Sequence, residues 1–177
     1  MESASLGSKA PVTNKLASPC TIDQTGISKF CLCLSRQNLP FVKRDAAQIA
    51  AVRRGGYVLS DAAGAKAIII ATGSEIDLAL KAQAALAAEG IAVRVVSMPS
   101  TNVFDRQDKA WRDSVLPAGL PRVAVEAGVS DGWYKYVGLD GKVVGLDRFG
   151  ESAPAGALFK EFGFTADNVA AVVKSVI

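Results

Sequence analysis

From Lys66 onward, apolar and polar positions follow a regular pattern along the chain. Residues 67–71 are apolar on both faces, which is typical of a buried parallel strand. Residues 75–89 place apolar side chains along one side at helical spacing, and Gly90 ends this predicted helix. A second apolar strand is expected at 93–96. Strand and helix therefore alternate in this region.

The same alternation continues to the C-terminus. The pattern predicts further strands at 123–126 and 143–146, and helices around 106–115, 133–137, 155–162 and 165–176. Strands and helices in turn at this spacing favour a mostly parallel sheet with helices on both faces. The predicted fold class is therefore α/β, a three-layer sandwich that extends from about Gly55 to Ile177.

The residues before this pattern have a different character. Residues 1–29 are rich in Ser, Thr, Lys, Ala and Pro without a clear period, which predicts a disordered or foreign leader. The apolar run 30–34 can form a strand, and 45–54 predict a short helix that ends at Gly55-Gly56. An edge strand is expected at 57–59.

Charge and hydropathy exclude two classes of protein. The chain has 20 basic and 17 acidic residues, and the two signs alternate along it. This mixture is not the one-signed stripe of a nucleic-acid binder. The apolar runs stay far below the roughly 20 residues that cross a bilayer, so a membrane protein is not expected.

Histidine is absent, and cysteine occurs three times. No Ser-His-Asp triad, His-ligated metal site or histidine base can therefore lie within this sequence. Cys20, Cys31 and Cys33 form neither an even disulfide set nor a CxxC pair. We therefore interpret them as free thiols that serve as small apolar residues in a reducing cytosol.

Two serines precede predicted helices and could belong to binding or catalytic sites. Ser74 lies in a strand-to-helix turn where backbone N–H groups can bind an anion. With Glu75 and Asp77 beside it, and without a GxGxxG or Walker motif, a helix cap is predicted instead. Ser152 lies in a sequence loosely like a nucleophile elbow, but Pro154 replaces the second glycine, and a cap is again predicted.

Three further features of the sequence can each be interpreted in two ways. Glu126 ends a strand, where α/β sheets place functional groups, but a lone carboxylate is more often an ion-pair or hydrogen-bonding residue. The aromatic residues Trp133, Tyr134 and Tyr136 suit a core and a protein interface equally. Arg36 follows an apolar strand among hydrogen-bonding side chains, where it can grip a phosphate or serve as a structural arginine.

Together these segments resemble the C-terminal end of transketolases, over the stretch from Ser35 to Ile177. The family's order is kept by the motifs SRQNLP, RGGYVL, IIIATGSEIDLAL, VRVVSMPSTNVFDRQD, VLP, VAVEAGVSDGWYKYVG and FGESAPAGALFKEFGFTADNV. The resemblance implies a homodimeric transferase of the pentose phosphate pathway with three α/β domains. Such an enzyme moves a two-carbon ketol unit between sugar phosphates with thiamine diphosphate and Mg²⁺.

What the resemblance assigns to residues of this chain is limited. The cofactor and metal ligands and the catalytic groups of the family lie upstream, so no catalytic, cofactor or metal residue is expected here. The arginine of the SRQN motif, Arg36, is implied to contact the sugar phosphate. The third domain contributes dimer packing, which favours an interface or packing role for Trp133 to Tyr136.

The resemblance also divides the chain. Residues 1–29 fall outside the family, 30–54 correspond to the end of the middle, pyrimidine-binding domain and its linker, and 55–177 correspond to the C-terminal domain. We expect a cytoplasmic fragment of a transketolase that is inactive alone and binds neither cofactor by itself. The alternative is a separate assembly or binding subunit, which pairs with itself or complements a chain that carries the missing domains.

Overall fold

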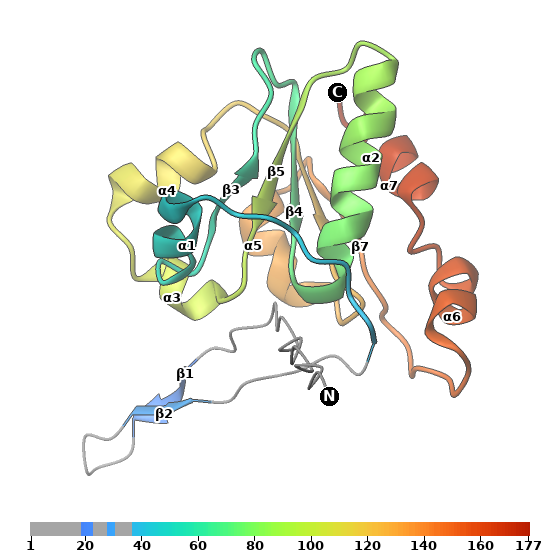
Figure 1. The fold of residues 1–177 in the computed structure, drawn as a ribbon, viewed down its shortest axis with the longest axis horizontal. Helices are drawn as coiled ribbons and strands as arrows, with labels where there is room; N and C mark the ends of the chain where they lie inside the picture. Colours follow the sequence, from blue (N-terminus) through green and yellow to red (C-terminus); the bar gives the residue numbers. More distant parts are fainter. Residues whose placement is uncertain (1–18, 23–27, 31–36) are drawn as a thin grey trace, which may run out of the picture.

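The computed structural model describes residues 19–22, 28–30 and 37–177. Its main feature is a five-stranded sheet in the order β3-β5-β4-β6-β7 (Figure 1). The strands are β3 (Tyr57–Ser60), β4 (Ala67–Ala71), β5 (Val93–Ser97), β6 (Arg122–Val125) and β7 (Lys142–Val144). Strands β4 to β7 are parallel, and β3 pairs antiparallel with β5 at one edge. The predicted α/β class with a mostly parallel sheet is confirmed.

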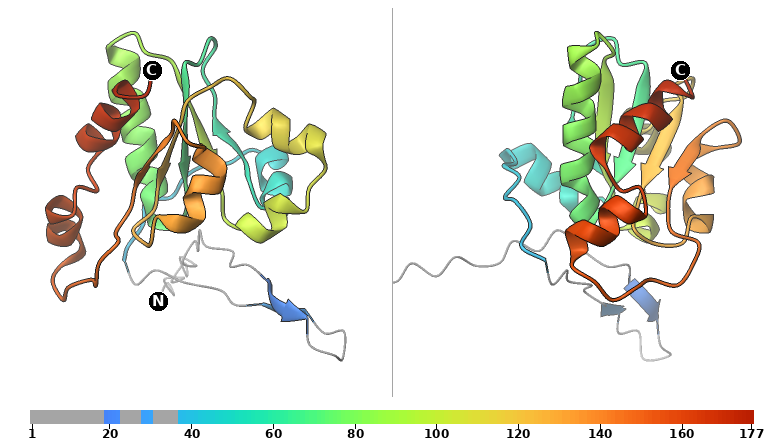
Figure 2. Two further views of the ribbon diagram at one scale, coloured as in Figure 1. Left: turned by 180° about the vertical axis from the view of Figure 1, so that it is seen from behind. Right: turned by 90° about the vertical axis from the view of Figure 1, so that its right-hand side faces the viewer.

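Helices lie on both faces of this sheet, as Figure 2 shows from two sides. Helices α2 (Ile76–Ala88) and α7 (Ala166–Lys174) pack on one face, where Ile69, Val95 and Val123 are buried. On the other face, α3 (Thr101–Asp105), α4 (Lys109–Val115) and α5 (Tyr134–Val137) cover Ile68, Ile70 and Ala124. The sheet is therefore the middle of three layers.

Strand β4 contributes side chains to the apolar cores on both faces of the sheet. All five of its residues are fully buried, because β5 and β6 pair with it and helices cover both of its faces. Burial of each isoleucine side chain contributes roughly 1.5–3 kcal/mol. The uninterrupted apolar sequence of this strand is what its central position requires.

The helix predicted around 106–115 is α4, which begins three residues later, at Lys109. Asp108 sets this start, because its carboxylate accepts the backbone N–H of Trp111 at 2.7 Å as the N-cap of α4. Helix α3 precedes it as a separate short helix that the sequence pattern did not predict.

The N-terminal part of the described chain covers the β3 edge. Helix α1 (Ala46–Val52) begins with a capping box between Asp45 and Gln48. The Gln48 Nε2 also donates to the carbonyls of Val58 and Leu59 in β3, at 3.3 and 2.7 Å. The extended segment 37–45 leads to α1 across the front of the sheet (Figure 1). This contact occupies edge carbonyls that another chain could pair with.

Five short elements remain. The 3-10 helices η1 (Gly73–Glu75) and η2 (Asp131–Trp133) precede α2 and α5. Helix α6 (Ala155–Glu161) has no buried residue and is anchored through Phe159, whose ring lies 5.5 Å from that of Phe164. Strands β1 (Pro19–Ile22) and β2 (Ser28–Phe30) form a separate antiparallel pair. The rest of 1–36 lies outside the described residues, so the leader remains a prediction.

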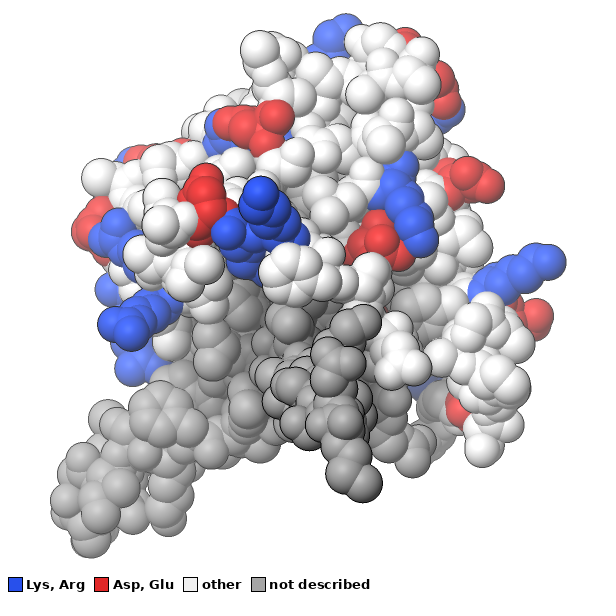
Figure 3. Space-filling model, in the orientation of Figure 1, with Lys and Arg blue, Asp and Glu red and all other residues white. Residues whose placement is uncertain are grey.

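Charged side chains are spread over the visible face with both signs interspersed (Figure 3). Along the described ranges, no helix combines the length and apolar character needed to span a bilayer.

Candidate functional site

The carboxyl ends of β4, β5, β6 and β7 meet at one edge of the sheet, the usual place for a site in an α/β fold. The turn after β4 brings Thr72 to Glu75 to this edge, and Glu126 directly follows β6. The sequence candidates Ser74 and Glu126 are thus at the ends of neighbouring strands.

The turn after β4 differs from the capped helix that the sequence predicts. Helix α2 begins at Ile76 without a side-chain cap, so the assignment of Ser74 as its N-cap is wrong. The Ser74 hydroxyl instead donates to Oε1 of Glu75 at 2.8 Å. Glu75 is only 1% exposed, because η1 turns its side chain into the protein before α2 starts. The Ser74 hydroxyl therefore gives the buried side chain of Glu75 a hydrogen-bond partner.

This acidic turn does not fit a phosphate or diphosphate. Glu75 and Asp77 place carboxylates in the first turn of α2, where an anion would otherwise find the backbone N–H groups. Asp77 pairs with Lys81 at 2.6 Å. The hollow in front of the turn is lined by Leu39, Pro40, Val42, Gly73, Ser74, Ile76 and Asp77 and has room for about one water molecule.

Beyond β6 and β7 the two chain segments stay connected for several residues. The Glu126 N–H donates to the Val144 carbonyl at 3.1 Å, and the Leu146 N–H donates to the Gly128 carbonyl at 2.8 Å. The Asp147 carboxylate accepts the backbone N–H and the hydroxyl of Ser130, both at 2.8 Å. These two bonds hold the pKa of Asp147 below its usual value.

The sequence left a core role and an interface role open for Trp133, Tyr134 and Tyr136, and the structure separates these residues. Trp133 and Tyr136 are buried with ring centroids 5.9 Å apart, so both belong to the core. The Tyr136 hydroxyl donates to Asp105 at 2.9 Å, and Lys135 pairs with the same carboxylate at 2.7 Å. Burial, with a smaller effect of Asp105, raises the pKa of Tyr136. Tyr134 is 52% exposed and remains available at the surface.

The amino ends of β6 and β7 contain a residue that sequence reasoning missed. The Arg122 guanidinium donates to the carbonyls of Tyr136, Leu116 and Pro117 at 2.8, 3.0 and 3.0 Å. It thereby satisfies carbonyls at the ends of α4 and α5. Burial lowers the pKa of this guanidinium. Its partners come from separate segments, so no local signal identified its role.

Two other candidates from the sequence, Ser152 and Arg36, remain to be placed. Ser152 does not cap α6, because Pro154 occupies the N-cap position and no side-chain bond is made there. Arg36 lies outside the described residues, so its phosphate contact remains a prediction. Within residues 19–22, 28–30 and 37–177, no three His, Cys, Asp or Glu side chains gather closely enough to hold a metal ion.

The sheet and its helices match a known domain. The model of the transketolase-like C-terminal domain matches residues 55–165. The chain belongs to this family. This transketolase domain begins just before β3 and includes every strand of the main sheet.

Individual transketolases agree with the domain match. The chain is 60% identical over 148 residues to transketolase 1 of Escherichia coli, which covers 82% of this chain and 22% of that protein. The transketolase of Leishmania mexicana superposes with a TM-score of 0.76 and 46% identity, over 82% of this chain and 21% of its own. The chain therefore spans about a fifth of the length of these relatives.

A third relative has a different coverage. A solved structure of a split gene transketolase, described as an inactive beta4 tetramer, superposes with a TM-score of 0.61 and 30% identity. The superposition covers 48% of the split gene transketolase chain and 81% of the present chain. The same domain thus occurs in a shorter transketolase polypeptide.

Proposed function

We propose that this chain acts as the C-terminal part of a transketolase and that its task is assembly. In the whole enzyme it would support transfer of a two-carbon ketol unit between sugar phosphates. The observation that carries this proposal is the 60% identity over 148 residues to transketolase 1 of Escherichia coli. Because the match covers 22% of that protein, the activity belongs to the whole enzyme and the chain alone is inactive.

In this proposal the whole enzyme uses thiamine diphosphate and Mg²⁺, held by other parts of the protein. The buried Glu75 and the neighbouring Asp77 at the start of α2 do not fit a diphosphate. Arg36 would contact the phosphate of the sugar once the upstream domains complete its pocket. The sequence places this arginine immediately before the described chain resumes at Gln37.

A ketol-transfer assay tests the proposal directly. The purified chain is incubated with thiamine diphosphate, Mg²⁺, a ketose phosphate donor and an aldose phosphate acceptor. A second reaction adds a polypeptide with the part of Escherichia coli transketolase 1 that precedes the matched region. We expect turnover in the second reaction and none in the first. Turnover by the chain alone would overturn the proposal, as would failure of the two polypeptides to form a complex.

A second candidate function is a separate cytoplasmic subunit that also pairs with itself. The split gene transketolase favours this candidate, because that protein shares the domain and is described as a beta4 tetramer. Light scattering on the purified chain distinguishes the forms, since one copy has a mass of 18.4 kDa. A mass equal to a single copy at micromolar concentration would exclude stable self-association.

A further inference from the structure

The burial of the chain changes abruptly at Gly55. None of the residues 39–54 is buried, although this segment crosses in front of the sheet and ends in helix α1. Gly55, Gly56 and Tyr57, which follow directly, are all buried. We call residues 39–54 the strap. Because a segment with few buried contacts opens more easily than the core of its domain, the contacts that keep the strap closed decide how stable it is.

The C-terminal end of the strap is firmly held. The Arg54 guanidinium carbon lies 4.0 Å from the centroid of the Trp111 ring, and the same guanidinium donates to Asp108 at 3.1 Å. At Gly55, where φ is +81°, an added Cβ would lie 2.4 Å from the Ser100 carbonyl oxygen. The chain is therefore clamped where the strap leads into β3, so the strap can open only on the N-terminal side of this point.

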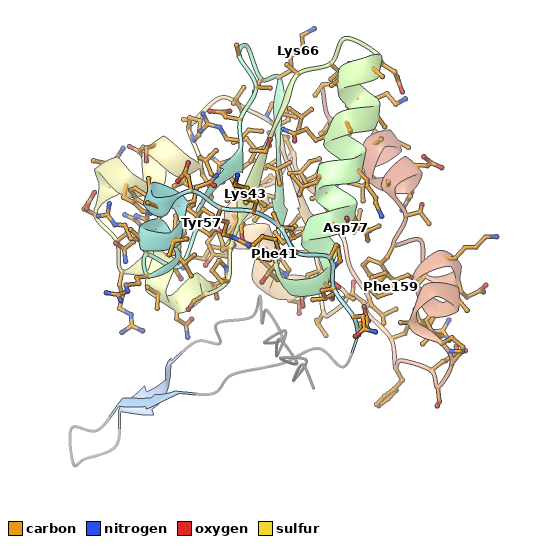
Figure 4. All side chains as sticks on the ribbon, in the orientation of Figure 1. Phe41, Lys43, Tyr57, Lys66, Asp77 and Phe159 are labelled. Carbon is orange, nitrogen blue, oxygen red and sulfur yellow. The ribbon has the colours of Figure 1, made fainter. Side chains whose placement is uncertain are left out.

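The rest of the strap is held by partly buried side chains. Figure 4 shows Phe41 on the part that crosses in front of the sheet. Arg44 donates to the Tyr57 hydroxyl at 2.6 Å. Three apolar residues of the strap pack partly buried against the core: Val42, Ala51 and Val52. Helix α1 has seven residues, and an isolated helix of this length is unstable in water, so α1 depends on its contacts with the sheet.

Gln48 joins the start of α1 to the edge of the sheet. Its Oε1 accepts the backbone N–H of Asp45 at 3.2 Å, which completes the capping box. Its Nε2 donates to the carbonyls of Val58 and Leu59 in β3, at 3.3 and 2.7 Å. The amide thereby occupies backbone acceptors of an edge strand, to which another strand could otherwise bind. One side chain thus starts the helix and covers the edge.

Strand β3 has the properties of an edge that needs a cover. Its sequence is YVLS, and its aromatic and β-branched residues favour strand pairing. It pairs with β5 on one side, and its register shifts between Val58 and Ser60. An irregular register is one protection of an edge strand, and the Gln48 amide adds a second. Without the amide, the carbonyls of β3 would lack their side-chain donor.

We propose that the strap covers the β3 edge, that the Gln48 amide keeps it closed, and that its opening lets β3 pair with β3 of a second copy. This inference goes beyond the proposed function and does not depend on ketol transfer. The occupant is a second copy because two identical strands in antiparallel arrangement are related by a two-fold axis and are self-complementary. Each copy has a single β3, so this pairing joins two copies and stops there.

Gln48→Glu separates the two tasks of this residue. A carboxylate still accepts the Asp45 N–H in the capping box, but it has no hydrogen to donate to the carbonyls of β3. Gln83→Glu is the matched control. The Gln83 amide also donates to a strand carbonyl, that of Val93 at 2.7 Å, but Val93 belongs to β5, which has a strand on each side. Circular dichroism verifies that each variant is folded.

Hydrogen exchange followed by mass spectrometry measures the opening of each segment in the full chain. It is carried out at a concentration where each variant has the mass of the parent chain. We expect Gln48→Glu to speed exchange in peptides from α1 and β3 at least about tenfold, because a donor is lost and a negative charge faces two carbonyls. Exchange in α2 should stay unchanged. Gln83→Glu should change exchange in α1 and β3 less than about twofold.

Light scattering at higher concentration measures the pairing of copies. We expect Gln48→Glu to have a larger mass than the parent chain at the same concentration, and Gln83→Glu to have the mass of the parent. Val58→Glu, added to Gln48→Glu, should restore the mass of the parent. Two copies paired through β3 would bring these like charges together, and charged side chains on an edge strand oppose pairing.

Other results would contradict the proposal in different ways. Unchanged exchange of α1 and β3 in Gln48→Glu would show that the amide does not hold the strap. Faster exchange of α2 to the same degree would show that the strap is not a separate unit. Faster exchange of the strap without a larger mass would exclude the β3 edge as a pairing site, as would a larger mass that Val58→Glu does not reverse.

Discussion

The two ends of β6 and β7 are built in different ways, although the strands are the same. At the amino ends, Arg122 donates to three carbonyls, and Gly141 lies where an added Cβ would be 2.5 Å from the Val137 carbonyl oxygen. At the carboxyl ends, hydrogen bonds join the two chain segments as far as Ser130 and Asp147, and Val129 and Phe149 are exposed beside them. The first end is held by a partly buried arginine, and the second by hydrogen bonds between exposed segments.

This difference decides where substitutions destabilise the domain. At the amino ends the two Nη atoms of Arg122 bond to three carbonyls of the domain, so substitutions there act on folding. Val129 and Phe149 are exposed, so substitutions there are expected to change the free energy of unfolding little.

Arg122→Met is expected to have the largest effect on stability. The substitution keeps an unbranched apolar stem and removes the guanidinium with its bonds to the carbonyls of Leu116, Pro117 and Tyr136. Because hydrogen bonds from a charged group are strong and the carbonyls lose their partner, we expect a loss of about 3 kcal/mol. Urea unfolding measures it.

Arg53→Met provides the matched control, since Arg53 is an exposed arginine at the end of α1. It is expected to change the free energy of unfolding by less than about 0.5 kcal/mol. Equal losses from the two substitutions would mean that the carbonyl contacts of Arg122 contribute little, and that the amino end is not the stabilised one.

Gly141→Ala is expected to cost about 2 kcal/mol, because overpacking against backbone atoms cannot be relieved by a side-chain rotation. The added Cβ would lie 2.5 Å from the Val137 oxygen and 2.6 Å from the Arg122 oxygen. Gly150→Ala is the comparison at the carboxyl end, where an added Cβ meets nothing within 4 Å. Thermal unfolding of both variants measures the difference, and a similar change in Tm for the two would contradict the comparison.

The sequence was sufficient for the strands of the five-stranded sheet and insufficient for β1 and for details that depend on distant residues. The apolar run of β4 and the helical spacing of α2 are local patterns, and both were predicted correctly. The start of α4 was predicted three residues too early, because Asp108 was treated as a polar helix position although it caps α4. Helix α3 was not predicted.

The candidate site was harder to predict for the same reason. Ser74 precedes a helix and resembles a cap, yet it bonds to the buried Glu75, whose position depends on the fold around η1. Phe149 belongs to a residue type that is most often buried, and only the tertiary structure shows that its segment passes outside the domain. Arg36, the site residue taken from the family motif, remains a prediction.

Ser130→Ala is expected to have a smaller and pH-dependent effect. The Ser130 backbone N–H and hydroxyl lower the pKa of Asp147 in the folded state, so this contribution to stability is present above the ordinary value of 3.8 and is lost as the pH falls through the folded pKa. Removal of the hydroxyl raises the folded pKa towards 3.8. The variant should therefore differ from the parent most at pH 7 and least at an acidic pH below the folded pKa of Asp147.

Two measurements check this prediction. Carboxyl NMR titration follows the pKa of Asp147, and urea unfolding at both pH values gives the stability difference. Ser114→Ala is the control, because the Ser114 hydroxyl donates to the Trp111 carbonyl and not to an acid. A loss that is the same at both pH values for Ser130→Ala would show that the bond to Asp147 is not its cause.

Phe149→Ser is expected to have the smallest effect on the stability of the domain, within about 0.5 kcal/mol, because an exposed side chain loses no burial when it is replaced. Phe164→Ser is the matched control, since Phe164 is buried against Phe159 and its replacement should cost several kcal/mol. Urea unfolding of the isolated chain measures both. A large loss from Phe149→Ser would mean that its side chain packs within the domain, and the carboxyl end of β6 and β7 would then be another stabilising region. A negligible loss would show that the exposed segment beyond β7 contributes little to the stability of the domain, in contrast to the amino ends of these strands.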